Sequence, residues 1–514
     1  MKKLIQNTKL LVIAGLCFFT LLSYKAFEAF NNPLEKIYTQ TDRPFYFPGE
    51  TIWFKSYIVN TDNTITTISD VMHAELISPK GAVVTSLNLN VKQGYAYGNF
   101  DISSDWVGGI YTLKCYTNWM RNYGEDSFFT KKITIQKVVK PKLLLNLKFE
   151  KEGYGKSSEV IANLEVKDLK NQPLSHTEVT YKVSVKGTDI INDVVVTDKD
   201  GKAKPSFTLP EDLESVDVVL NALVYHKGTT ESISRAVPVV LNTIDLQFLP
   251  ESGKIVAGTL NKIAFKALNE FGKPVDLKGD VVNAKGETVS NFESFHDGMG
   301  SFNFNPIKDE VYHAKITEPF RSEELIQLPK VYENGVRFSV TTDSLSTNLD
   351  IFSTYSTPLF LEVSNASALL LKKEIGLKKN ISLNTSEYPM GITKFSLKNE
   401  YGSTFAERLV FLNPHKKLHV DLSLDKEVYN TREKVKLTIK TYDEKQNPIP
   451  ANLSLAVADN KLLSFADDKQ DHILSYLLVS SELKGEIHKP DFYLNPKEPK
   501  SKTAIDYVML TPGW

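Results

Sequence analysis

Two groups of side chains in this sequence have the types that bind metal ions. His415 and His419 are four residues apart, with Asp421 just beyond, and the segment D-K-D-G begins at Asp198. Imidazole nitrogens are ligands for zinc, and aspartate oxygens are ligands for calcium. Both groups are therefore candidates for a metal site, and their spacing decides between a metal and ordinary turns.

Neither spacing suits a metal ion. In a strand, positions 415 and 419 lie on one face about 13 Å apart, which is too far to share one zinc ion. A calcium-binding loop that starts at Asp198 needs Glu at its twelfth position, where this chain has Leu209. The sequence therefore favours structural turns over metal binding at both places.

Catalytic motifs give no positive signal. The sequence has no G-x-S-x-G, no H-E-x-x-H, no phosphate-binding loop and no dinucleotide fingerprint. Its nine histidines are scattered through different predicted domains. A pair of carboxylates for glycoside hydrolysis is set by the fold, so the sequence neither indicates nor excludes that chemistry. We assign no catalytic, cofactor-binding or metal-binding residue, and we predict a protein that is not an enzyme.

The composition limits the class of protein. The chain has 514 residues, enough for several domains, and a hydrophobic content of 41% is ample for packed cores. Its 61 Lys and Arg residues balance 62 Asp and Glu residues. A nucleic-acid-binding surface needs a basic excess, so we expect no nucleic-acid partner.

The first thirty residues have the pattern of an export signal, in which lysines precede an apolar run from Leu10 to Leu22. At roughly 13 residues, this run suits a signal segment better than a membrane span, which needs about 20. No small-x-small cleavage triplet follows, and Leu16 stands before Cys17 where a lipidation signal prefers Gly or Ala. Cleavage, lipidation and retention as an anchor all stay open. We predict an exported protein of the periplasm, outer membrane or cell surface.

Cys115 is the one cysteine outside this leader. Without the leader, the chain can form no intramolecular disulfide. In Y-T-L-K-C-Y-T, Cys115 shares strand parity with Tyr111 and Leu113. We therefore predict a buried structural thiol.

The strands that organise the chain begin around Asp42-Arg43-Pro44 and Pro48-Gly49-Glu50. Proline cannot donate to a sheet and Gly49 can take a positive φ, so this stretch forms an edge or corner. We predict that Asp42, Arg43, Pro44, Pro48, Gly49 and Glu50 shape it, with a charge-assisted hydrogen bond between Asp42 and Arg43. After the corner, apolar residues alternate along 52–59, as in a pleated strand of a β-sandwich.

Three tryptophans, Trp53, Trp106 and Trp119, raise the alternative of a glycan-binding platform. Tryptophan is more often buried or half-buried than displayed on a surface. We therefore expect these three side chains in or beside the core.

The stretch D-R-P-F-Y-F-P-G-E-T-I-W-F-K resembles the first strands of macroglobulin-like domains of MG2 type, the immunoglobulin-like β-sandwich modules of α2-macroglobulins and complement proteins. With the preceding Y-T-Q-T, it is similar to a group of long exported bacterial proteins that carry strings of such domains. Phe248–Val275 and His296–Pro306 also resemble segments of that group. The resemblance implies a fold and no single activity, because one fold hosts many functions.

The pattern of the first strands returns around Glu152–Val160 and Asp425–Ile439. A repeat of about 80 to 105 residues is typical of whole domains rather than of a solenoid. We predict an all-β tandem array of about five macroglobulin-type antiparallel β-sandwiches, with one short helix near the C-terminus in I-L-S-Y-L-L-V-S-S-E-L-K-G. The predicted boundaries are an export signal at 1–30, β-sandwiches at 33–136, 144–241, 245–333, 336–413 and 418–490 (the last with the helix), and a Pro-rich apolar tail at 491–514.

Two further segments carry local predictions. V-V-V-T-D-K-D-G-K-A-K-P-S-F-T-L-P predicts a hairpin that turns at Asp200-Gly201. The final A-I-D-Y-V-M-L-T-P-G-W resembles a segment that continues, in longer relatives, into further residues and domains. Whether Trp514 is the natural end therefore stays open.

One inhibitory mechanism is excluded by the cysteines. Macroglobulin inhibitors of the thioester class need Cys followed by Gly-Glu-Gln, whereas Cys17 is followed by Phe-Phe and Cys115 by Tyr-Thr. The sequence therefore excludes a thioester.

Two functions remain as hypotheses. The first is a non-enzymatic envelope scaffold or binding protein with a protein partner. The longer relatives also carry domains akin to the plug of TonB-dependent outer-membrane receptors, which implies an outer-membrane transporter as partner and membrane association through it or through the N-terminal segment. The alternative is an endopeptidase inhibitor of α2-macroglobulin type that works without a thioester, by bait cleavage and conformational trapping, with a protease as partner.

Overall fold

The structure is a computed structural model, and it describes residues 34–135, 142–240, 244–269, 272–343, 345–366, 368–377, 379–458, 471–485 and 487–511. The predicted leader with Cys17, residues 136–141 between the first two predicted sandwiches, and Trp514 lie outside these residues. The described chain divides into two compact units. The first comprises residues up to Thr39, Trp53–Phe100 and Tyr111–Lys132, and the second comprises Gln40–Ile52, Asp101–Ile110 and the chain from Ile133 onward.

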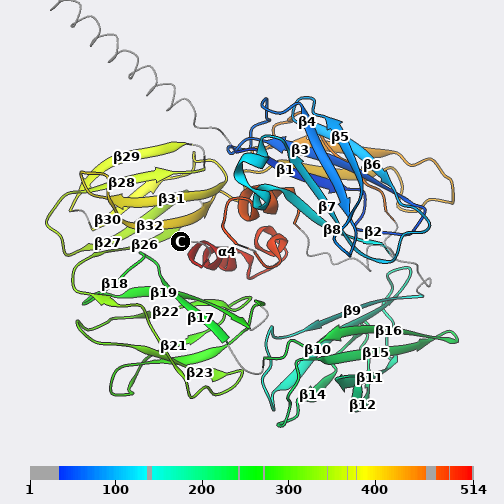
Figure 1. The fold of residues 1–514 in the computed structure, drawn as a ribbon, viewed down its shortest axis with the longest axis horizontal. Helices are drawn as coiled ribbons and strands as arrows, with labels where there is room; N and C mark the ends of the chain where they lie inside the picture. The colour runs from blue at the N-terminus through cyan, green and yellow to red at the C-terminus, as the bar shows by residue number, and fades with distance from the viewer. Residues whose placement is uncertain are drawn as a thin grey trace, which may run out of the picture. The chain divides into compact units, whose positions relative to one another are not determined.

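The first sandwich has two antiparallel layers with one parallel strand at an edge (Figure 1). Alternate residues of β3, such as Ile52 and Phe54, are buried, as the predicted parity requires. One sheet has the order β1-β3-β6 and the other β2-β8-β7-β4-β5. The strands are β1 Lys36–Thr41, β2 Phe45–Tyr46, β3 Thr51–Val59, β4 Val71–Ile77, β5 Val83–Asn90, β6 Tyr95–Asp101, β7 Gly109–Thr117 and β8 Phe129–Ile135, with short 3₁₀ turns η1 Met120–Tyr123 and η2 Glu125–Ser127.

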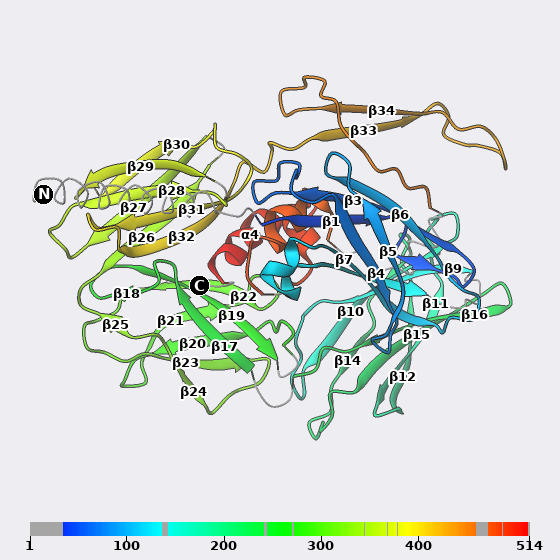
Figure 2. The ribbon, with the colours of Figure 1, turned by 45° about the horizontal axis from the view of Figure 1, so that its top comes forward.

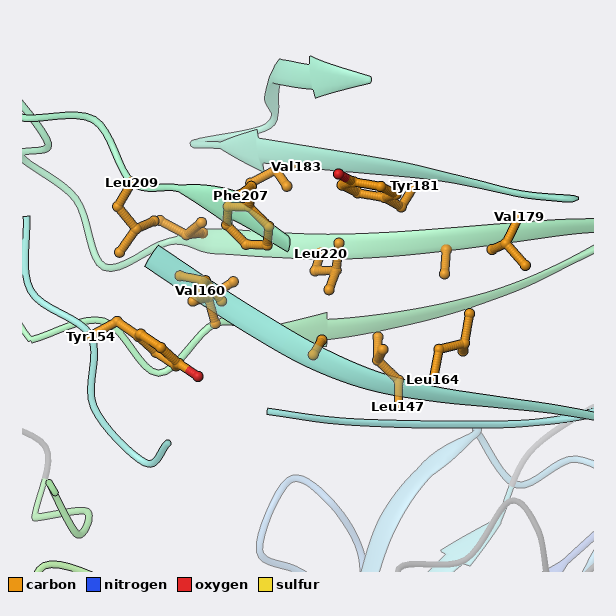
Figure 3. Packing of buried hydrophobic residues seen from close by; sticks show 14 of the residues in the cluster. Leu147, Tyr154, Val160, Leu164, Val179, Tyr181, Val183, Phe207, Leu209 and Leu220 are labelled. Atoms are coloured by element: carbon orange, nitrogen blue, oxygen red, sulfur yellow. The ribbon is translucent and has the colours of Figure 1, made fainter. Parts of the chain in front are cut away.

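The second sandwich pairs β9 and β10, with β13 and β14 beside β10, against a sheet of order β12-β11-β15-β16. Its core is filled by inward residues of both sheets, among them Leu147, Val160 and Leu164 from one and Val179 and Leu220 from the other (Figure 3). The strands are β9 Leu143–Phe149, β10 Glu159–Asp168, β11 Glu178–Val185, β12 Thr188–Val196, β13 Lys202–Ala203, β14 Ser206–Thr208, β15 Val218–His226 and β16 Thr229–Ala236.

The third and fourth sandwiches follow the same plan. In the third, the sheets have the orders β17-β19-β22 and β21-β20-β23-β24, and β18 pairs with β25. In the fourth, they have the orders β26-β27-β30 and β29-β28-β31-β32. The strands are β17 Ile244–Pro250, β18 Ile255–Val256, β19 Asn261–Asn269, β20 Lys278–Val282, β21 Thr288–Glu293, β22 Met299–Phe304, β23 His313–Glu318, β24 Leu325–Gln327, β25 Val331–Tyr332, β26 Val336–Thr342, β27 Ser346–Ser353, β28 Leu359–Ser364, β29 Leu369–Gly376, β30 Asn380–Asn384, β31 Gly391–Lys398 and β32 Thr404–Leu412.

A two-stranded sheet and several helical turns complete the described chain. Figure 2 shows β33, His419–Leu424, and β34, Leu437–Tyr442, as a ribbon of two antiparallel strands. The helical turns are α3 Ile473–Ser475, the π-helical η3 Tyr476–Ser480, the 3₁₀ turn η4 Pro490–Leu494 and α4 Ser501–Leu510.

These observations confirm the predicted fold class, since the described chain is mostly antiparallel strand in two-sheet sandwiches and helical turns occur where the short helix was predicted. The exact domain boundaries stay predictions. Helix α4 lies in the stretch predicted as a tail; it follows Pro499 and buries Ala504 and Val508. None of the described helices is long and apolar enough to cross a membrane.

The predicted hairpin at Asp200-Gly201 is wrong. The turn is there, with a φ of +71° at Gly201. However, β12 pairs with β11 and β13 pairs with β10, so the turn carries the chain from one sheet to the other. A turn signal fixes the reversal of the chain but not the strand with which each arm pairs.

Candidate functional site

The predicted corner around Asp42 is held by a compact set of hydrogen bonds. The Tyr46 hydroxyl donates to Asp42 Oδ1 at 2.5 Å, and Arg43 Nε donates to Asp42 Oδ2 at 3.3 Å. Arg43 Nη1 reaches Glu50 Oε1 at 3.1 Å, while Glu50 Oε2 accepts from the Phe47 backbone at 2.8 Å. Burial, followed by the bond to Asp42, raises the pKa of Tyr46 above its ordinary value. The corner is therefore a rigid structural element, and its charged groups are already paired with one another.

The same corner occurs again between β33 and β34. The Tyr429 hydroxyl donates to Asp425 Oδ1 at 2.5 Å, and Glu433 Oε2 accepts from the Asn430 backbone at 2.8 Å. Lys426 takes the place of Arg43 and pairs with Glu433. A partial copy in the second sandwich has the Lys151 backbone donating to the Tyr154 hydroxyl at 3.0 Å. The corner pattern thus recurs between β33 and β34, and the fifth sandwich at 418–490 stays a prediction.

The inner face of this hairpin is exposed. In the register of β33 with β34, Leu422 lies opposite Ile439 and Leu424 opposite Leu437, so one face is apolar. The exposed fractions are 61% for Leu422, 54% for Leu424 and 38% for Ile439. In the second sandwich, the corresponding Leu147 of β9 is only 3% exposed. A contiguous exposed apolar face of this kind is typical of an interaction surface.

The segment after the hairpin is also accessible. Residues 450–458 have no regular secondary structure although A-N-L-S-L-A-V alternates like a strand. The exposed fractions are 61% for Leu455 and 90% for Val457. The hairpin and this segment, residues 418–458, form the candidate functional site.

Of the two metal candidates, Asp198 lies in a turn and His419 lies against an aromatic ring. Asp198 accepts hydrogen bonds from the Asp200 and Lys202 backbones at 2.8 and 2.9 Å, which is the geometry of a turn stabilised by its own aspartate. His419 stacks on Tyr442, with ring centroids 5.3 Å apart. Within the described ranges, no three His, Cys, Asp or Glu side chains gather as metal ligands.

The expectation for the tryptophans is wrong for Trp53. Trp106 and Trp119 are partly buried, but Trp53 is 59% exposed. In β3, Trp53 has the opposite parity to Ile52 and Phe54, so it faces outward. The same face carries Lys55, whose ammonium lies 5.0 Å from the ring centroid of Tyr57.

Cys115 is buried, as its strand parity predicts. Burial raises the pKa of its thiol to about 12. The thiolate is the reactive form, so this cysteine is inert in the folded sandwich.

A buried arginine joins three parts of the second unit, and no motif indicated it. Arg408 of β32 is fully buried, and its Nε donates to Glu251 Oε1 at 3.1 Å. Its Nη2 donates to Asp506 Oδ1 of α4 at 2.6 Å. Glu251 follows β17 directly, the position that Asp42 takes after β1. Arg408 thus connects the third sandwich, the fourth sandwich and α4.

A second charged cluster joins the C-terminal segment to the third sandwich. Asp297 Oδ2 lies 2.8 Å from His488 Nδ1 and 3.5 Å from His296 Nε2. Lys489 lies 3.6 Å from Asp297 Oδ1 and also pairs with Glu152 of the second sandwich. The His296 ring stacks on Phe492 with centroids 3.9 Å apart.

The pKa values in this cluster follow from burial and charge. Burial acts to raise the pKa of Asp297, but the hydrogen bond with His488 and the neighbouring positive charges outweigh it, so the pKa is lowered. Burial lowers the pKa of His296 and raises that of nearby Asp276. Asp297 pairs with His488, His296 and Lys489, while Asp276 accepts from the Gly298 backbone at 3.1 Å, which is the arrangement of a structural clamp.

A hollow of about 390 Å³ on the third sandwich is a weaker candidate. It is lined by Gly258, Pro306 and Ile307 together with Lys308 and Glu333. The two charged side chains pair with each other at 2.8 Å. The hollow therefore presents no unused charge to a ligand.

Comparison with known proteins supports the same domain type. Residues 36–129 match the MG2 domain family. An α2-macroglobulin of Ralstonia nicotianae is 27% identical over 154 residues, which are 29% of this chain and 9% of that protein. The chain thus spans a small part of the length of this curated relative.

Among solved structures, similarity extends over most of the chain. A crystal structure of trypsin-activated α2-macroglobulin from Escherichia coli has a TM-score of 0.43 and 12% identity, covering 80% of this chain and 33% of that one. A crystal structure of Salmonella α2-macroglobulin reacted with methylamine has a TM-score of 0.35 and 12% identity, covering 81% and 32%.

Proposed function

Because the chain is macroglobulin-like, with an MG2 domain at residues 36–129, we propose that it is a non-enzymatic binding or scaffold protein of the bacterial envelope. The observation that carries this proposal is the exposed apolar face of β33 and β34. The charged groups around Arg408 pair with Glu251 and Asp506, and those around Asp297 pair with His488 and Lys489, so we assign them a structural rather than a chemical role.

The buried ion pairs support the idea of a rigid frame that carries a binding surface. The clamp at Arg408 fixes α4 on the third and fourth sandwiches, while the hairpin stays open in the same unit. Charged groups that are buried and paired restrict motion, whereas an unpaired sheet edge offers backbone hydrogen bonds to another chain. The described residues therefore combine buried, paired charged groups with an exposed hairpin edge at β34.

The partner that we propose is an outer-membrane protein, with a TonB-dependent transporter first among the candidates. The basis is the similarity of the opening motif to long exported proteins that also carry plug-like domains, together with an export signal in the first thirty residues. Both are inferences from sequence. On this basis, we propose that the protein lies in the periplasm or at the outer membrane.

Cross-linking in the native envelope tests this function. The tagged full-length chain and a Leu422→Asp variant are each purified after gentle cross-linking, and the recovered proteins are quantified by mass spectrometry. We expect an outer-membrane barrel or receptor with the wild-type chain and at least a tenfold smaller amount with the variant. Leu369→Asp, an exposed leucine on β29 with an exposed fraction of 59%, is the control and should not change the recovery. Equal recovery with Leu422→Asp would show that the face carrying Leu422 does not bind the partner.

A second candidate function is protease inhibition without a thioester. The observation that favours it is the exposed, irregular segment that ends in Leu455 and Val457, because extended accessible chain is what a protease cleaves. The curated relative is named an α2-macroglobulin. In this mechanism, cleavage of one bait segment drives a conformational change that traps the protease.

Limited proteolysis separates the two functions. An inhibitor is cut first within residues 450–458, becomes more compact in solution, and protects the protease from a large protein substrate while small substrates are still cleaved. A scaffold is cut in several linkers without compaction and leaves the activity of the protease toward large substrates unchanged. We expect the second result.

A further inference from the structure

The sandwiches differ in how their edge strands are protected from pairing with another chain. A sheet edge presents unpaired N–H and C=O groups, which charges, bulges or a short strand normally block. In the second sandwich, the Thr197 N–H donates to the Thr177 carbonyl of the neighbouring strand, so by alternation the Val194 N–H of β12 faces the free edge. The carboxylate of Asp193 accepts from that N–H at 2.8 Å. A charged side chain thus occupies this edge.

Edge strands of the third and fourth sandwiches are blocked in other ways. In the third, β24 ends its sheet and has three residues, too few for a long ladder. In the fourth, two bulges interrupt the pairing of β29 with β28. Lys373 of β29 lies opposite the buried Leu361, so its charge is on the inner face. An inward charge and bulges are devices that hinder an added strand.

Strand β5 of the first sandwich has none of these devices along most of its length. It ends the larger sheet, and in the part of the chain that the structure describes it pairs with β4 alone (Figure 1). Its eight residues, V-V-T-S-L-N-L-N, include no charged residue and no proline. The one shift of register lies at its start, and the pairing is regular from Thr85 to Asn90. This strand is therefore a long, uncharged edge.

The hydrogen-bond pattern shows which groups of β5 face outward. Just after the strand, the Val91 N–H donates to the Asp70 carbonyl at 2.8 Å. In an antiparallel pair, every second residue exchanges hydrogen bonds with the neighbouring strand. The residues that bond to β4 in the regular part are therefore Thr85, Leu87 and Leu89. The residues between them offer their N–H and C=O groups at the free edge: Ser86, Asn88 and Asn90.

The same alternation separates the side chains of β5 into two rows. Leu87 and Leu89 lie opposite the fully buried Ala74 and Met72, so they are on the inner face of the sheet. Both leucines are only half-buried, because they stand at the open side of the sandwich. The outer row is exposed, polar and uncharged, and it consists of Ser86, Asn88 and Asn90.

The order of these side chains makes β5 complementary to itself. When two copies of the strand are paired antiparallel about a two-fold axis at Asn88, Leu87 lies opposite Leu89 of the second copy, and Ser86 lies opposite its Asn90. Residues that face each other across a pair lie on the same face of the sheet, so leucine meets leucine and polar meets polar. All the edge groups of the outer row then fall in hydrogen-bonded pairs.

The lack of charge favours a second copy of this chain over an unrelated strand. In a two-fold contact, a residue on the axis faces its own copy, so a charged residue there would meet a like charge. Strand β5 places Asn88 at that point, and a pair of amides can donate to and accept from each other. No residue of β5 opposes its own pairing.

We propose that two copies of the chain associate through β5, with Asn88 on the two-fold axis, so that the sheet β2-β8-β7-β4-β5 continues into the same sheet of the second copy. Main-chain hydrogen bonds hold the two strands together, and the leucine pairs cover each other on the inner face. This surface lies in the first sandwich and is separate from the face of β33 and β34, so the inference goes beyond the proposed function.

Sedimentation equilibrium of the full-length protein tests the pairing. We expect self-association with a dissociation constant of about 10 to 500 µM, because one pair of edge strands buries less area than a standard stable interface. Asn88→Asp and Asn88→Lys should each weaken it at least tenfold, since each places like charges opposite one another on the axis. An equimolar mixture of the two variants should associate at least as tightly as the wild-type chain, because opposite charges then face each other.

Two further changes control for indirect effects. Ser86→Pro removes an N–H from the free edge but no hydrogen bond to β4, so it should weaken self-association at least tenfold while hydrogen exchange of β4 stays as in the wild type. Asn192→Asp and Asn192→Lys make the same changes at an exposed asparagine of the edge strand β12. Both should leave the dissociation constant unchanged.

Three results would overturn the inference. The first is a protein that stays monomeric up to about 1 mM. The second is self-association that is equal in the wild-type chain and both Asn88 variants, or a mixture of the two variants that associates no better than either alone. The third is self-association that is lost in Leu422→Asp and kept in Asn88→Lys, which would assign it to the hairpin β33–β34. Recovery of an envelope partner depends on Leu422 and not on Asn88, so the proposed function stands or fails separately.

Discussion

The Tyr46 hydroxyl donates to Asp42 Oδ1 over 2.5 Å, between residues four apart in a corner that joins two strands of the first sandwich. Tyr429 and Asp425 make the same bond over the same distance. The two copies differ in their surroundings, because Tyr46 is fully buried and Asp42 partly buried, whereas Tyr429 is only partly buried and Asp425 is exposed. The two sites therefore compare the same hydrogen bond at different burial.

Tyr46→Phe should destabilise the first sandwich by about 1 to 3 kcal/mol, because it removes a part-buried hydrogen bond from a fully buried hydroxyl to a charged group. Tyr429→Phe should cause no measurable change, because water replaces the lost partner. Trp53, Trp106 and Trp119 all lie in the first sandwich, so tryptophan fluorescence in a Trp514→Phe background follows the effect of Tyr46→Phe on its unfolding in urea. Hydrogen exchange of β33 and β34 follows the effect of Tyr429→Phe. A shift of similar size in both variants would show that burial does not decide the strength of this bond.

Much of the fold could be predicted from alternation and turn chemistry. The buried parity of Ile52 and Phe54, the corner at Pro48-Gly49 and the buried Cys115 all depend on neighbours in sequence, and local patterns record such neighbours. The copy of the corner at Asp425 was visible for the same reason. The strand pairing around Gly201 could not be predicted. After the turn, β13 could pair with β12 or with β10, and the choice depends on the whole sandwich.

The clamp residues could not be predicted from sequence. Arg408 is separated from Glu251 by 157 residues and from Asp506 by 98. No spacing rule connects such positions, since the contacts arise only when two sandwiches and α4 pack together. The exposure of the apolar face of β33–β34 could not be predicted either, because V-D-L-S-L and L-T-I-K-T alternate like any strand with one buried face.

Removing the buried arginine should loosen the C-terminal segment. Arg408→Met leaves the carboxylate of Glu251, which is 4% exposed, without its cation, and breaking a buried pair in this way costs about 3 to 5 kcal/mol. We expect faster hydrogen exchange in α4 and β32. Adding Glu251→Gln removes the stranded charge and should restore part of the protection. No recovery in the double variant would indicate that Arg408 acts through Asp506 alone.

Acidification should loosen the same segment through His296 and Asp297. Burial lowers the pKa of His296 from its ordinary 6.5, so below pH 6.5 the loosened form takes up a proton that the packed form refuses. The pKa of Asp297 is depressed below 3.8, so the stability it contributes is present above pH 3.8 and is lost as the pH falls through the folded value. Both effects lower stability as the pH falls.

Hydrogen exchange of η4 and α4, corrected for intrinsic rates, should therefore be faster at about pH 5 than at about pH 7.5. His296→Gln should flatten this dependence between the two values. His176→Gln, in an exposed turn of the second sandwich, serves as the control and should retain the wild-type profile. A wild-type profile in His296→Gln would assign the pH dependence to other groups in the segment.

Leu147 and Leu422 occupy equivalent positions in two hairpins, opposite Leu164 and Ile439, with exposed fractions of 3% and 61%. Leu147→Ala should destabilise the second sandwich by about 2 to 5 kcal/mol, because a packed core loses contacts and gains a cavity. Leu422→Ala should change the stability by less than about 0.5 kcal/mol, as surface substitutions usually do. Hydrogen exchange of β10 measures the first effect and that of β34 the second. A stability loss in the free protein as large as that of Leu147→Ala would mean that the inner face of β33–β34 is already covered.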